Sequence, residues 1–394
     1  MAVLQGFHGL TMNILVVNSG SSSLKMSMFQ TTDTQVPLQA AWDREQDVDW
    51  QNESPENIEQ KIHKTLEALW QGEQALLSSR DQIEFVGHRI VHGGPQYLAP
   101  VELKPAVVND LSKLNEFAPL HNPINLSALK LVLRLLPKAR HIGVFDTAFH
   151  STLKPEAAIY PGPYSWYADL NIKKYGFHGI SHKYCSDRAA QIVGRRQLRI
   201  VSCHLGGGCS LAAVLDGVSM DTTMGFTPLD GLMMRSRSGA IDPGILIYLL
   251  KNNKYSVDEL DHVLNKESGM KGIFERSADL RDITKAMLAG DERAKLTFDM
   301  FVHRLSGSIA AMVTALGGLD VLLFTGGIGE HSSYVRAAAC RKLSYMNLAL
   351  DEKLNDADPV DIDVASSSSQ VRILVVKARE DWQIATECAS FSDS

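Results

Sequence analysis

Three turns rich in glycine and serine carry the residue types that bind phosphate. Each follows an apolar run typical of a β-strand, and the turns lie at residues 18–25, 204–210 and 324–330. Backbone N–H groups and serine hydroxyls in such turns can approach an anion closely, and Lys25 adds a point charge to the first turn. None of the turns has the glycine spacing of a P-loop or of a dinucleotide-binding fold. The three turns together predict a nucleotide held in a cleft between two related halves of the chain.

Further polar side chains lie where apolar segments end in turns. Arg89 ends one such segment, and its guanidinium could match carboxylate or phosphoryl oxygens in bidentate geometry, or make a surface ion pair. Arg237 lies in a glycine-containing loop between apolar segments, a place where loops often carry function. Asp146 follows an apolar strand, where α/β sheets place catalytic groups, although it could instead cap the next helix. His178 and His121 could each be active-site residues or satisfied structural histidines.

The composition is that of an ordinary globular protein. The chain has 394 residues, 45% of them hydrophobic and 21% charged, and one hydrophobic core seldom serves such a length. The net charge of −6 provides no basic surface for nucleic acid or an anionic membrane. No apolar stretch approaches the roughly 18 residues that would cross a bilayer. The five cysteines form no C-x-x-C pair, which argues against a disulfide framework and a zinc site. We therefore expect a cytoplasmic protein of two domains, with no nucleic-acid or membrane partner.

Short β-type runs alternate with helical patterns along the chain, which predicts an α/β architecture. Apolar spacing of three to four residues predicts helices over 54–77 and 299–316, and a C-terminal helix is expected over 381–391, packed against the N-terminal half. Met12 is a natural start, so residues 1–11 are expected to be an extension without a fold of their own.

Taken together, these segments resemble the acetate kinase family, which includes propionate kinases and belongs to the wider group of sugar kinases, actin and Hsp70-type ATPases. The resemblance runs from Met12 to the C-terminal helix. Residues 18–25 and 221–232 look like the two signatures of the family. Other matching segments follow in the family's order at residues 88–94, 119–123, 145–150, 175–182 and 324–330.

The resemblance implies a two-domain actin-like ATPase (ribonuclease H-like) fold. Each domain would have a βββαβαβα core, and the active site would lie in the interdomain cleft. The N-terminal domain would comprise residues 12–149 plus 383–394, and the C-terminal domain, with the nucleotide site, residues 150–382. A homodimer is the usual assembly in the family.

The resemblance also implies a reaction, the reversible Mg²⁺-dependent transfer of the ATP γ-phosphoryl group to acetate, giving acetyl phosphate and ADP. An ionised carboxylate needs no deprotonation, so positioning and charge neutralisation can supply most of the catalysis. By similarity, Arg89 would hold the substrate carboxylate, and Arg237 with His178 would stabilise the transferring group. Asp146 matches the family's active-site Asp, and it would orient an arginine or a metal-bound water, or carry a proton.

The remaining expected contacts also come from the resemblance. Mg²⁺, or Mn²⁺ in its place, would be held by Asn18 and Glu380. A small acyl pocket that accepts both acetate and propionate to some degree would be lined by Val91, Leu120, Phe177 and Pro228. The contacts of ATP or ADP would be Lys25, His204, Leu205, Gly206, Gly207, Gly208, Asp279, Leu280, Arg281, Gly327, Ile328, Gly329, Glu330 and His331.

Several positions near the expected site depart from the family pattern. Gly207 and His331 stand where the family usually has Asn, Ala240 stands where it usually has Asp, and the neighbours of Glu380 differ. These departures leave the phosphoryl donor open. Propionate or another short carboxylate is the alternative substrate. A non-catalytic nucleotide-binding relative and a sugar kinase are the alternatives of other classes, although the first would not need Arg89 and the second would need a larger polar pocket.

Overall fold

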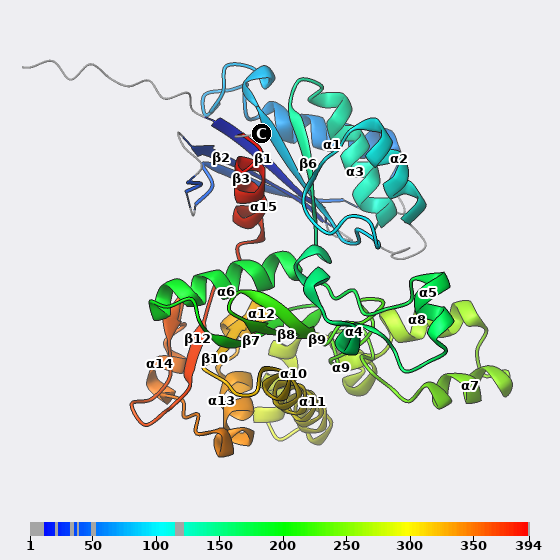
Figure 1. Ribbon diagram of the computed structural model, residues 1–394, viewed down its shortest axis with the longest axis vertical. Coiled ribbons are helices and arrows are strands. Elements are labelled where there is room, and N and C mark those ends of the chain that lie inside the picture. The colour runs from blue at the N-terminus through cyan, green and yellow to red at the C-terminus, as the bar shows by residue number, and fades with distance from the viewer. Residues whose placement is uncertain are drawn as a thin grey trace, which may run out of the picture. The chain divides into compact units, whose positions relative to one another are not determined.

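The computed structural model describes residues 12–19, 23–31, 35–37, 39–48, 53–114 and 122–392. Two compact units make up the chain, one formed by Met1–Ala148 with Arg379–Ser394 and the other by Phe149–Ala378. Each unit contains one mixed sheet with helices packed against it (Figure 1). The α/β class that the sequence predicts is therefore confirmed. No helix in the described part of the chain combines the length and the apolar character needed to cross a membrane.

The sheet of the first unit has six strands in the order β3-β2-β1-β4-β6-β5. The first three strands in the chain pair antiparallel, whereas β4 runs parallel to β1 and β6 runs parallel to β4. The strands are β1 (Met12–Ser19), β2 (Ser23–Thr31), β3 (Trp42–Asp47), β4 (Phe85–Ile90), β5 (Val101–Glu102) and β6 (Arg140–Phe145).

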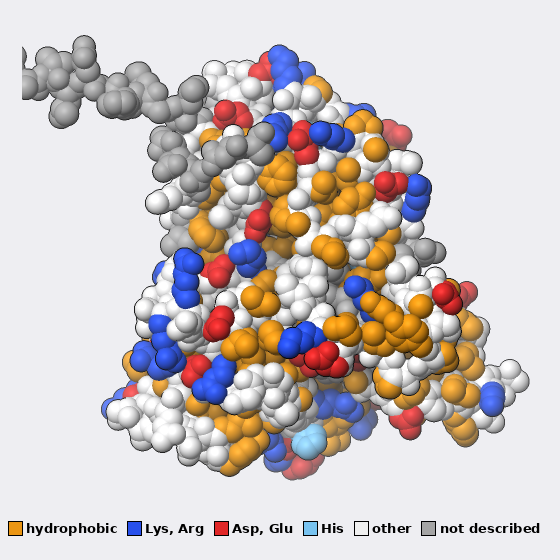
Figure 2. Space-filling model, viewed as in Figure 1, with side chains coloured by type: hydrophobic (Ala, Val, Ile, Leu, Met, Phe, Trp, Pro, Cys, Tyr) orange, Lys and Arg blue, Asp and Glu red, His pale blue; other side chains and the backbone are white. Residues whose placement is uncertain are grey.

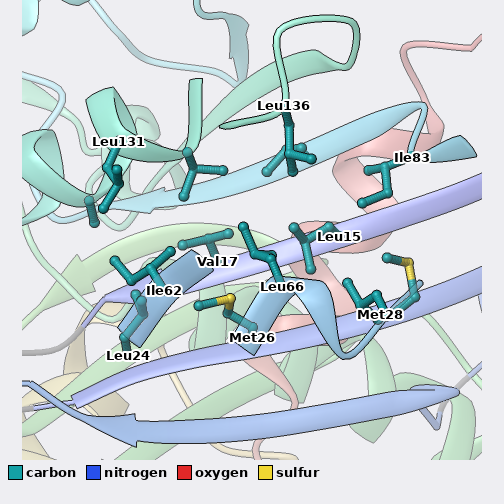
Figure 3. Packing of buried hydrophobic residues seen from close by; sticks show 14 of the residues in the cluster. Leu15, Val17, Leu24, Met26, Met28, Ile62, Leu66, Ile83, Leu131 and Leu136 are labelled. Atoms are coloured by element: carbon teal, nitrogen blue, oxygen red, sulfur yellow. The ribbon is translucent and has the colours of Figure 1, made fainter. Parts of the chain in front are cut away.

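Helices α1 (Pro55–Glu67) and α3 (Asn122–Leu135) cover one face of this sheet, and α2 (Pro105–Lys113) packs against α3. Figure 3 shows the core beneath α1 and α3, where Leu15 of β1 packs in one cluster with Ile62 of α1. The cluster is almost wholly buried and supplies the hydrophobic stabilisation of this unit.

The C-terminal helix α15 (Glu380–Ala389) packs on the other face of the sheet, against β1 and β4. Two neighbouring residues of β4 show this, because successive residues of a strand point to opposite faces. Val86 belongs to the α1–α3 core. A Cβ on its neighbour Gly87 would lie 2.5 Å from Cγ2 of Ile384 and 2.7 Å from Sγ of Cys388. Glycine at this position therefore allows α15 to approach β4 closely, and the helix packs on the N-terminal half as the sequence predicts.

The sheet of the second unit has the strand order β11-β12-β10-β7-β8-β9. It repeats the plan of the first, since an antiparallel run of three strands is followed by parallel strands β10 and β12. The strands are β7 (Arg199–Leu205), β8 (Cys209–Leu215), β9 (Val218–Thr222), β10 (Val321–Thr325), β11 (Ile362–Asp363) and β12 (Arg372–Val375).

Helix α6 (Gly179–Val193) packs against β7 and β10, and the long α11 (Glu292–Leu316) packs against β7, β8 and β9. The other helices of this unit are α4 (Pro155–Ala158), α5 (Tyr164–Leu170), α7 (Pro243–Lys251), α8 (Val257–Lys266), α9 (Gly269–Phe274), α10 (Leu280–Leu288), α12 (Gly326–His331), α13 (Ser333–Lys342) and α14 (Glu352–Asp356). Short 3₁₀ helices lie at Arg80–Gln82, Ala148–Thr152 and Ser344–Met346.

Candidate functional site

Parallel strands of the first unit bring three of the predicted polar residues to one edge of the sheet. Arg89 lies near the end of β4, Asp146 follows β6 directly, and Asn18 lies near the end of β1. The three strands are adjacent, with Val17 of β1 beside His88 of β4. Since the carboxyl ends of parallel strands share an edge, these side chains meet there. Glu380, the first residue of α15, joins them, and we call the four residues the Arg89 cluster.

Arg89 is the centre of this cluster. Its Nη2 and Nε donate to Oδ2 of Asp146 at 2.7 Å and 3.1 Å. Its Nη1 lies 3.2 Å from Oε2 of Glu380 and donates to Oδ1 of Asn18 at 3.2 Å. Asn18 Nδ2 also donates to Glu380 Oε2 at 3.3 Å. Asp146 therefore fixes one side of the guanidinium, while Nη1 is directed toward the two residues expected to hold a metal.

Burial controls the charges of the cluster. The buried position of Asp146 raises the pKa of its carboxyl to about 6, because desolvation outweighs the attraction of Arg89 and Glu380 adds repulsion. Burial opposes the charge on Arg89, but Asp146 and Glu380 outweigh that effect and raise the pKa of the guanidinium. Arg89 is therefore a cation at every physiological pH. Oδ1 of Asp146 is buried and has no hydrogen-bond partner among the described residues, so the carboxyl keeps one oxygen available to a ligand or water.

Asn125 is a residue of this region that sequence reasoning missed. Its Oδ1 accepts the backbone N–H of Val91 at 3.1 Å, and its Nδ2 donates to the carbonyl and hydroxyl oxygens of Ser19 at 3.0 Å and 2.9 Å. The side chain thus joins the chain beyond β4 to the end of β1. The signal in the sequence is an amide placed between the apolar residues Ile124 and Leu126 of α3.

The second unit brings His178 and Arg237 together at the turn between β7 and β8. A Cβ on Gly208 would lie 3.3 Å from Nε2 of His178 and 3.8 Å from Nη1 of Arg237. The ring of His204 stacks on that of His178, with centroids 4.3 Å apart and an angle of 25°. Burial lowers the pKa of Arg237, whose Nη1 also donates to the carbonyl of Pro228 at 3.4 Å. A cation and two imidazoles therefore line one glycine turn.

A cavity of about 780 Å³ opens beside the same turn. This volume is in the range of small-molecule and cofactor sites. Of the predicted nucleotide contacts, the residues that line it are Gly206, Gly207, Asp279, Leu280, Arg281, Gly327, Ile328 and His331. Lining residues that the sequence did not single out are Arg235, Ala278, Thr284, Lys285, Leu288, Ser332, Ser333 and Tyr334.

The other predicted nucleotide contacts lie off the cavity wall. Glu330 accepts the backbone N–H groups of Gly326 at 3.0 Å and Ala378 at 2.9 Å, so its carboxylate braces the third glycine turn. Lys25, in the first unit, lies 3.4 Å from Oδ2 of Asp381. The cavity lining likewise does not include His204 and Leu205 of β7, Gly208 in the turn after β7, and Gly329 of α12.

The predicted acyl-pocket residues are divided between the units. Val91 belongs to the first unit, Phe177 and Pro228 belong to the second, and Leu120 lies outside the described residues, as does His121. Val91 and Phe177 are buried. No group of three or more His, Cys, Asp or Glu side chains that could hold a metal occurs in the described ranges.

Known proteins resemble this chain over nearly its whole length. The acetokinase family model matches residues 13–386. An acetate kinase of Gloeobacter violaceus is 48% identical over 402 residues, covering 96% of this chain and 98% of that protein. The crystal structure of Porphyromonas gingivalis acetate kinase has a TM-score of 0.84 and 33% identity, covering 97% of this chain and 100% of that one. The crystal structure of a propionate kinase from Francisella tularensis has a TM-score of 0.85 and 33% identity, covering 96% of this chain and 99% of that one.

These likenesses confirm the prediction of an actin-like ATPase fold with two related α/β halves. The span that the family model matches runs from β1 into the C-terminal helix α15. Because the family model and a full-length relative both cover nearly all of it, the chain belongs to the acetokinase family.

Proposed function

We propose that the protein is an acetate kinase. It would transfer the γ-phosphoryl group of ATP to acetate, with Mg²⁺, to give acetyl phosphate and ADP, and the reaction would be reversible. One observation carries the proposal most directly. Nε2 of His178 and Nη1 of Arg237 lie together beside Gly208, in the turn whose Gly206 and Gly207 line the large cavity. This arrangement suits a nucleotide in the cavity with its terminal phosphate beside the imidazole and the guanidinium.

In this proposal His178 and Arg237 donate to the equatorial oxygens of the transferring phosphoryl group. Their charge and dipoles are fixed before the reaction, which is the main way that proteins catalyse phosphoryl transfer. Glycine at 208 suits this role, because a Cβ there would crowd the His178 ring and come into van der Waals contact with Nη1 of Arg237. The acceptor carboxylate is already ionised, so the mechanism needs no general base.

Arg89 binds the acceptor carboxylate in our proposal, and Asp146 orients Arg89. The bonds from Asp146 to Nε and Nη2 support this, since they hold the guanidinium plane while Nη1 is directed toward Asn18 and Glu380. Asp146 as a proton carrier is not required by the chemistry. The apolar residues Val91, Leu120, Phe177 and Pro228 are our candidates for the acyl pocket.

Asn18 and Glu380 are the residues that would hold Mg²⁺. The two side chains are neighbours, since Nδ2 of Asn18 donates to Oε2 of Glu380 at 3.3 Å. An amide oxygen and a carboxylate are oxygen donors that this ion prefers, and it commonly keeps several waters besides. Bound there, the ion would neutralise phosphate charge. Arg89 contacts both donors, which supports a site where the substrate carboxylate and the metal lie close together.

ATP, rather than a donor without a nucleoside, is the phosphoryl donor that the cavity favours. Its volume of about 780 Å³ is far larger than a diphosphate needs, and the apolar side chains of Leu280, Ile328 and Tyr334 contribute to its wall. Gly207 and His331, two of the departures from the family pattern, both line it. A Cβ on Gly207 would meet nothing within 4 Å, so there is open space beside this part of the cavity wall.

A homodimer is the assembly we propose, with α7 in the interface. No residue of α7 is buried, although its sequence is PGILIYLLK, and Ile245, Ile247 and Tyr248 are 47%, 54% and 62% exposed. Figure 2 shows hydrophobic side chains gathered on this part of the second unit. An exposed apolar helix of this kind usually marks a protein contact.

We propose a cytoplasmic location because the reaction uses ATP and all five cysteines are unpaired thiols.

The test is to trap the acyl phosphate as its hydroxamate. Purified protein would be incubated with ATP and Mg²⁺ and with acetate, propionate or butyrate in parallel, with Arg237→Ala as the inactive control. We expect hydroxamate with acetate and, at a lower kcat/KM, with propionate. A preference for propionate would make the protein a propionate kinase. No hydroxamate with any acid, despite measurable ATP binding, would refute the kinase and favour a non-catalytic nucleotide-binding protein.

A further inference from the structure

Two buried serines and a buried histidine form a chain of hydrogen bonds that ends at the ring of His178. Nδ1 of His178 lies 2.9 Å from Oγ of Ser210, and the same hydroxyl lies 2.8 Å from Nε2 of His182. Nδ1 of His182 lies 2.9 Å from Oγ of Ser202. Ser202, Ser210 and His182 are completely buried. The chain therefore runs Ser202, His182, Ser210, His178.

The local fold explains why these side chains meet. His178 and His182 are four residues apart at the start of α6, so their rings lie on the same side of the helix. Ser210 on β8 pairs in register with His204 on β7, and Ser202 lies two residues earlier on the same face of β7. This face is the one that α6 covers.

The hydrogens in this series of hydrogen bonds have two possible arrangements, because each neutral imidazole has one N–H and each serine has one O–H. In the first, Ser202 donates to Nδ1 of His182, Nε2–H of His182 donates to Ser210, and Ser210 donates to Nδ1 of His178. His178 then carries its hydrogen on Nε2. In the second, every bond is reversed, and His178 carries its hydrogen on Nδ1.

Ser202 decides between the two arrangements. In the described part of the chain, His182 Nδ1 is the hydrogen-bond partner of Ser202 Oγ. In the reversed arrangement the Ser202 hydroxyl would accept from that nitrogen, and its own hydrogen would be buried without an acceptor. Leaving a buried donor unsatisfied is costly, so the first arrangement is favoured. Burial also lowers the pKa of His182 well below its usual range, so this ring stays neutral and has only one N–H to donate.

We propose that Ser202, His182 and Ser210 are positioning residues that hold His178 in the tautomer with hydrogen on Nε2. Nε2 is the ring nitrogen beside Gly208 and near Arg237. In this tautomer it can donate to a phosphoryl oxygen, whereas in the other it would present a lone pair to an anion. The inference rests on the proposed role of His178 in phosphoryl transfer.

The structure holds His178 in place by other contacts as well. The residue has a backbone φ of +55°, a conformation that residues other than glycine seldom adopt and that persists where the surroundings enforce it. The carbonyl of Phe177, the preceding residue, accepts Nε2–H of His150 at 3.0 Å, and Nδ1 of His150 accepts the hydroxyl of Ser219 at 2.8 Å. His150 packs edge-on against the ring of His182, with centroids 5.7 Å apart, but it forms none of the hydrogen bonds between Ser202 and His178. Ser219 bonds only to His150 in this group, which makes Ser219→Ala the control for a change in packing alone.

The first test reads the tautomer directly. The full chain would be labelled with ¹⁵N-histidine, and two-bond ¹⁵N–¹H spectra would identify which ring nitrogen of His178 is protonated, with assignment from a His178→Asn variant. We expect protonated Nε2 in the unmodified protein and in Ser219→Ala. In Ser202→Ala and Ser210→Ala we expect loss of the single tautomer. Protonated Nδ1 in the unmodified protein, or an unchanged tautomer in both serine variants, would overturn the proposal.

The second test uses kinetics, and thermal unfolding would confirm that each variant is folded. We expect Ser210→Ala to lower kcat about tenfold while KM for acetate and ATP changes less than about threefold, because the lost interaction acts in the transition state. In a His178→Ala background the same substitution should have no further effect. An equal loss in both backgrounds would indicate a general structural role and contradict the inference. The spectra need no turnover, so they test the tautomer even if the hydroxamate assay refutes the kinase.

Discussion

At the scale of single residues, the Arg89 cluster depends on the charge of one buried carboxyl. Asp146 holds Arg89 through two hydrogen bonds, and its pKa of about 6 means that it is protonated as the pH falls below that value. A protonated Asp146 attracts the guanidinium less, because hydrogen bonds between charged groups are about twice as strong as neutral ones. Substrate binding should therefore weaken in mild acid.

We predict that kcat/KM for acetate in the unmodified protein falls as the pH decreases through about 6. Asp146→Asn should raise KM for acetate about tenfold at pH 7.5 and should remove this acidic limb, since the amide does not titrate. The measurement is a pH profile of both proteins between pH 5 and 9. Asp320→Asn, which breaks a different arginine pair, with Arg199, is the matched control and should keep the limb. A limb that persists in Asp146→Asn would show that another group causes it.

Buried histidines should make folding stability fall in acid as well. Nε2–H of His88 donates to Nδ1 of His141 at 2.9 Å, and Nε2–H of His141 donates to the carbonyl of Leu136 at 2.9 Å. Burial lowers the pKa of both rings, and each also lies near the other. The folded state then binds fewer protons than the unfolded chain below the ordinary histidine pKa of 6.5.

We predict that the free energy of unfolding falls as the pH is lowered from 6.5 toward 5, with the His88–His141 pair contributing up to about 1.4 kcal/mol per pH unit for each ring. Urea unfolding at several pH values would measure the slope. The double variant His88→Leu/His141→Leu should have a shallower slope. A slope equal to that of the unmodified protein would mean that the pair is not the source.

At the scale of elements, the helical pattern at 54–77 shows what periodicity can and cannot predict. The helix forms but ends at Glu67, and residues beyond it turn back, with the N–H of Leu77 donating to the carbonyl of Leu69 at 2.9 Å. Both leucines are nevertheless buried in the same core as Ile62, so the apolar pattern continues where the helix does not. Periodicity reports burial, whereas the end of a helix depends on local backbone geometry.

The same distinction applies to the candidate site. Arg89 and Asp146 were predictable because both follow apolar runs that become adjacent parallel strands. Arg235, Lys285 and Tyr334 were missed because they reach the cavity from separate elements, and no local pattern reports how those elements pack. Glu330 was predicted to contact the nucleotide from the resemblance to the family. Its carboxylate accepts two backbone N–H groups, and these hydrogen bonds are visible only in the tertiary structure.

Two glycines offer a matched test of element packing. Gly87→Ala places a methyl group within 2.7 Å of Ile384 and Cys388 on α15, so we predict a loss of about 1–3 kcal/mol in the free energy of unfolding. In Gly307→Ala the new methyl meets nothing within 4 Å inside α11, so this variant should gain about 0.5–1 kcal/mol. Urea unfolding of the two variants gives the comparison. Equal effects of the two substitutions would contradict close packing of α15 on β4.

At the scale of the whole molecule, the two units carry different parts of the proposed chemistry. The first contains the Arg89 cluster, with one guanidinium between two carboxylates, and the second contains His178, Arg237 and the nucleotide-sized cavity. Each sheet presents its functional groups at strand ends and turns, while helices on its faces supply the core. A catalytic cycle would therefore use residues from both units, although each cluster is organised by hydrogen bonds within its own unit.

The exposed apolar face of α7 leads to a prediction about assembly. Ile247 and Tyr248 are more than half exposed, and α7 has no buried residue to account for its apolar sequence. If this face is the dimer interface, a carboxylate placed there would be desolvated without a partner, which strongly opposes association. We therefore predict that Ile247→Glu/Tyr248→Glu converts a dimer into a monomer at micromolar concentration, as measured by size-exclusion chromatography with light scattering.

The control for this prediction is Leu354→Glu, which introduces one carboxylate at an exposed leucine on α14 and should leave the dimer intact. The monomer should keep its fold, because the α7 side chains contribute little to the core of their own unit. It should also keep the hydrogen bonds of the Arg89 cluster and those that hold His178 and Arg237. Hydroxamate formation by the monomer would therefore separate assembly from catalysis. A dimer that survives both glutamates would place the interface elsewhere and leave the apolar face of α7 for a different partner.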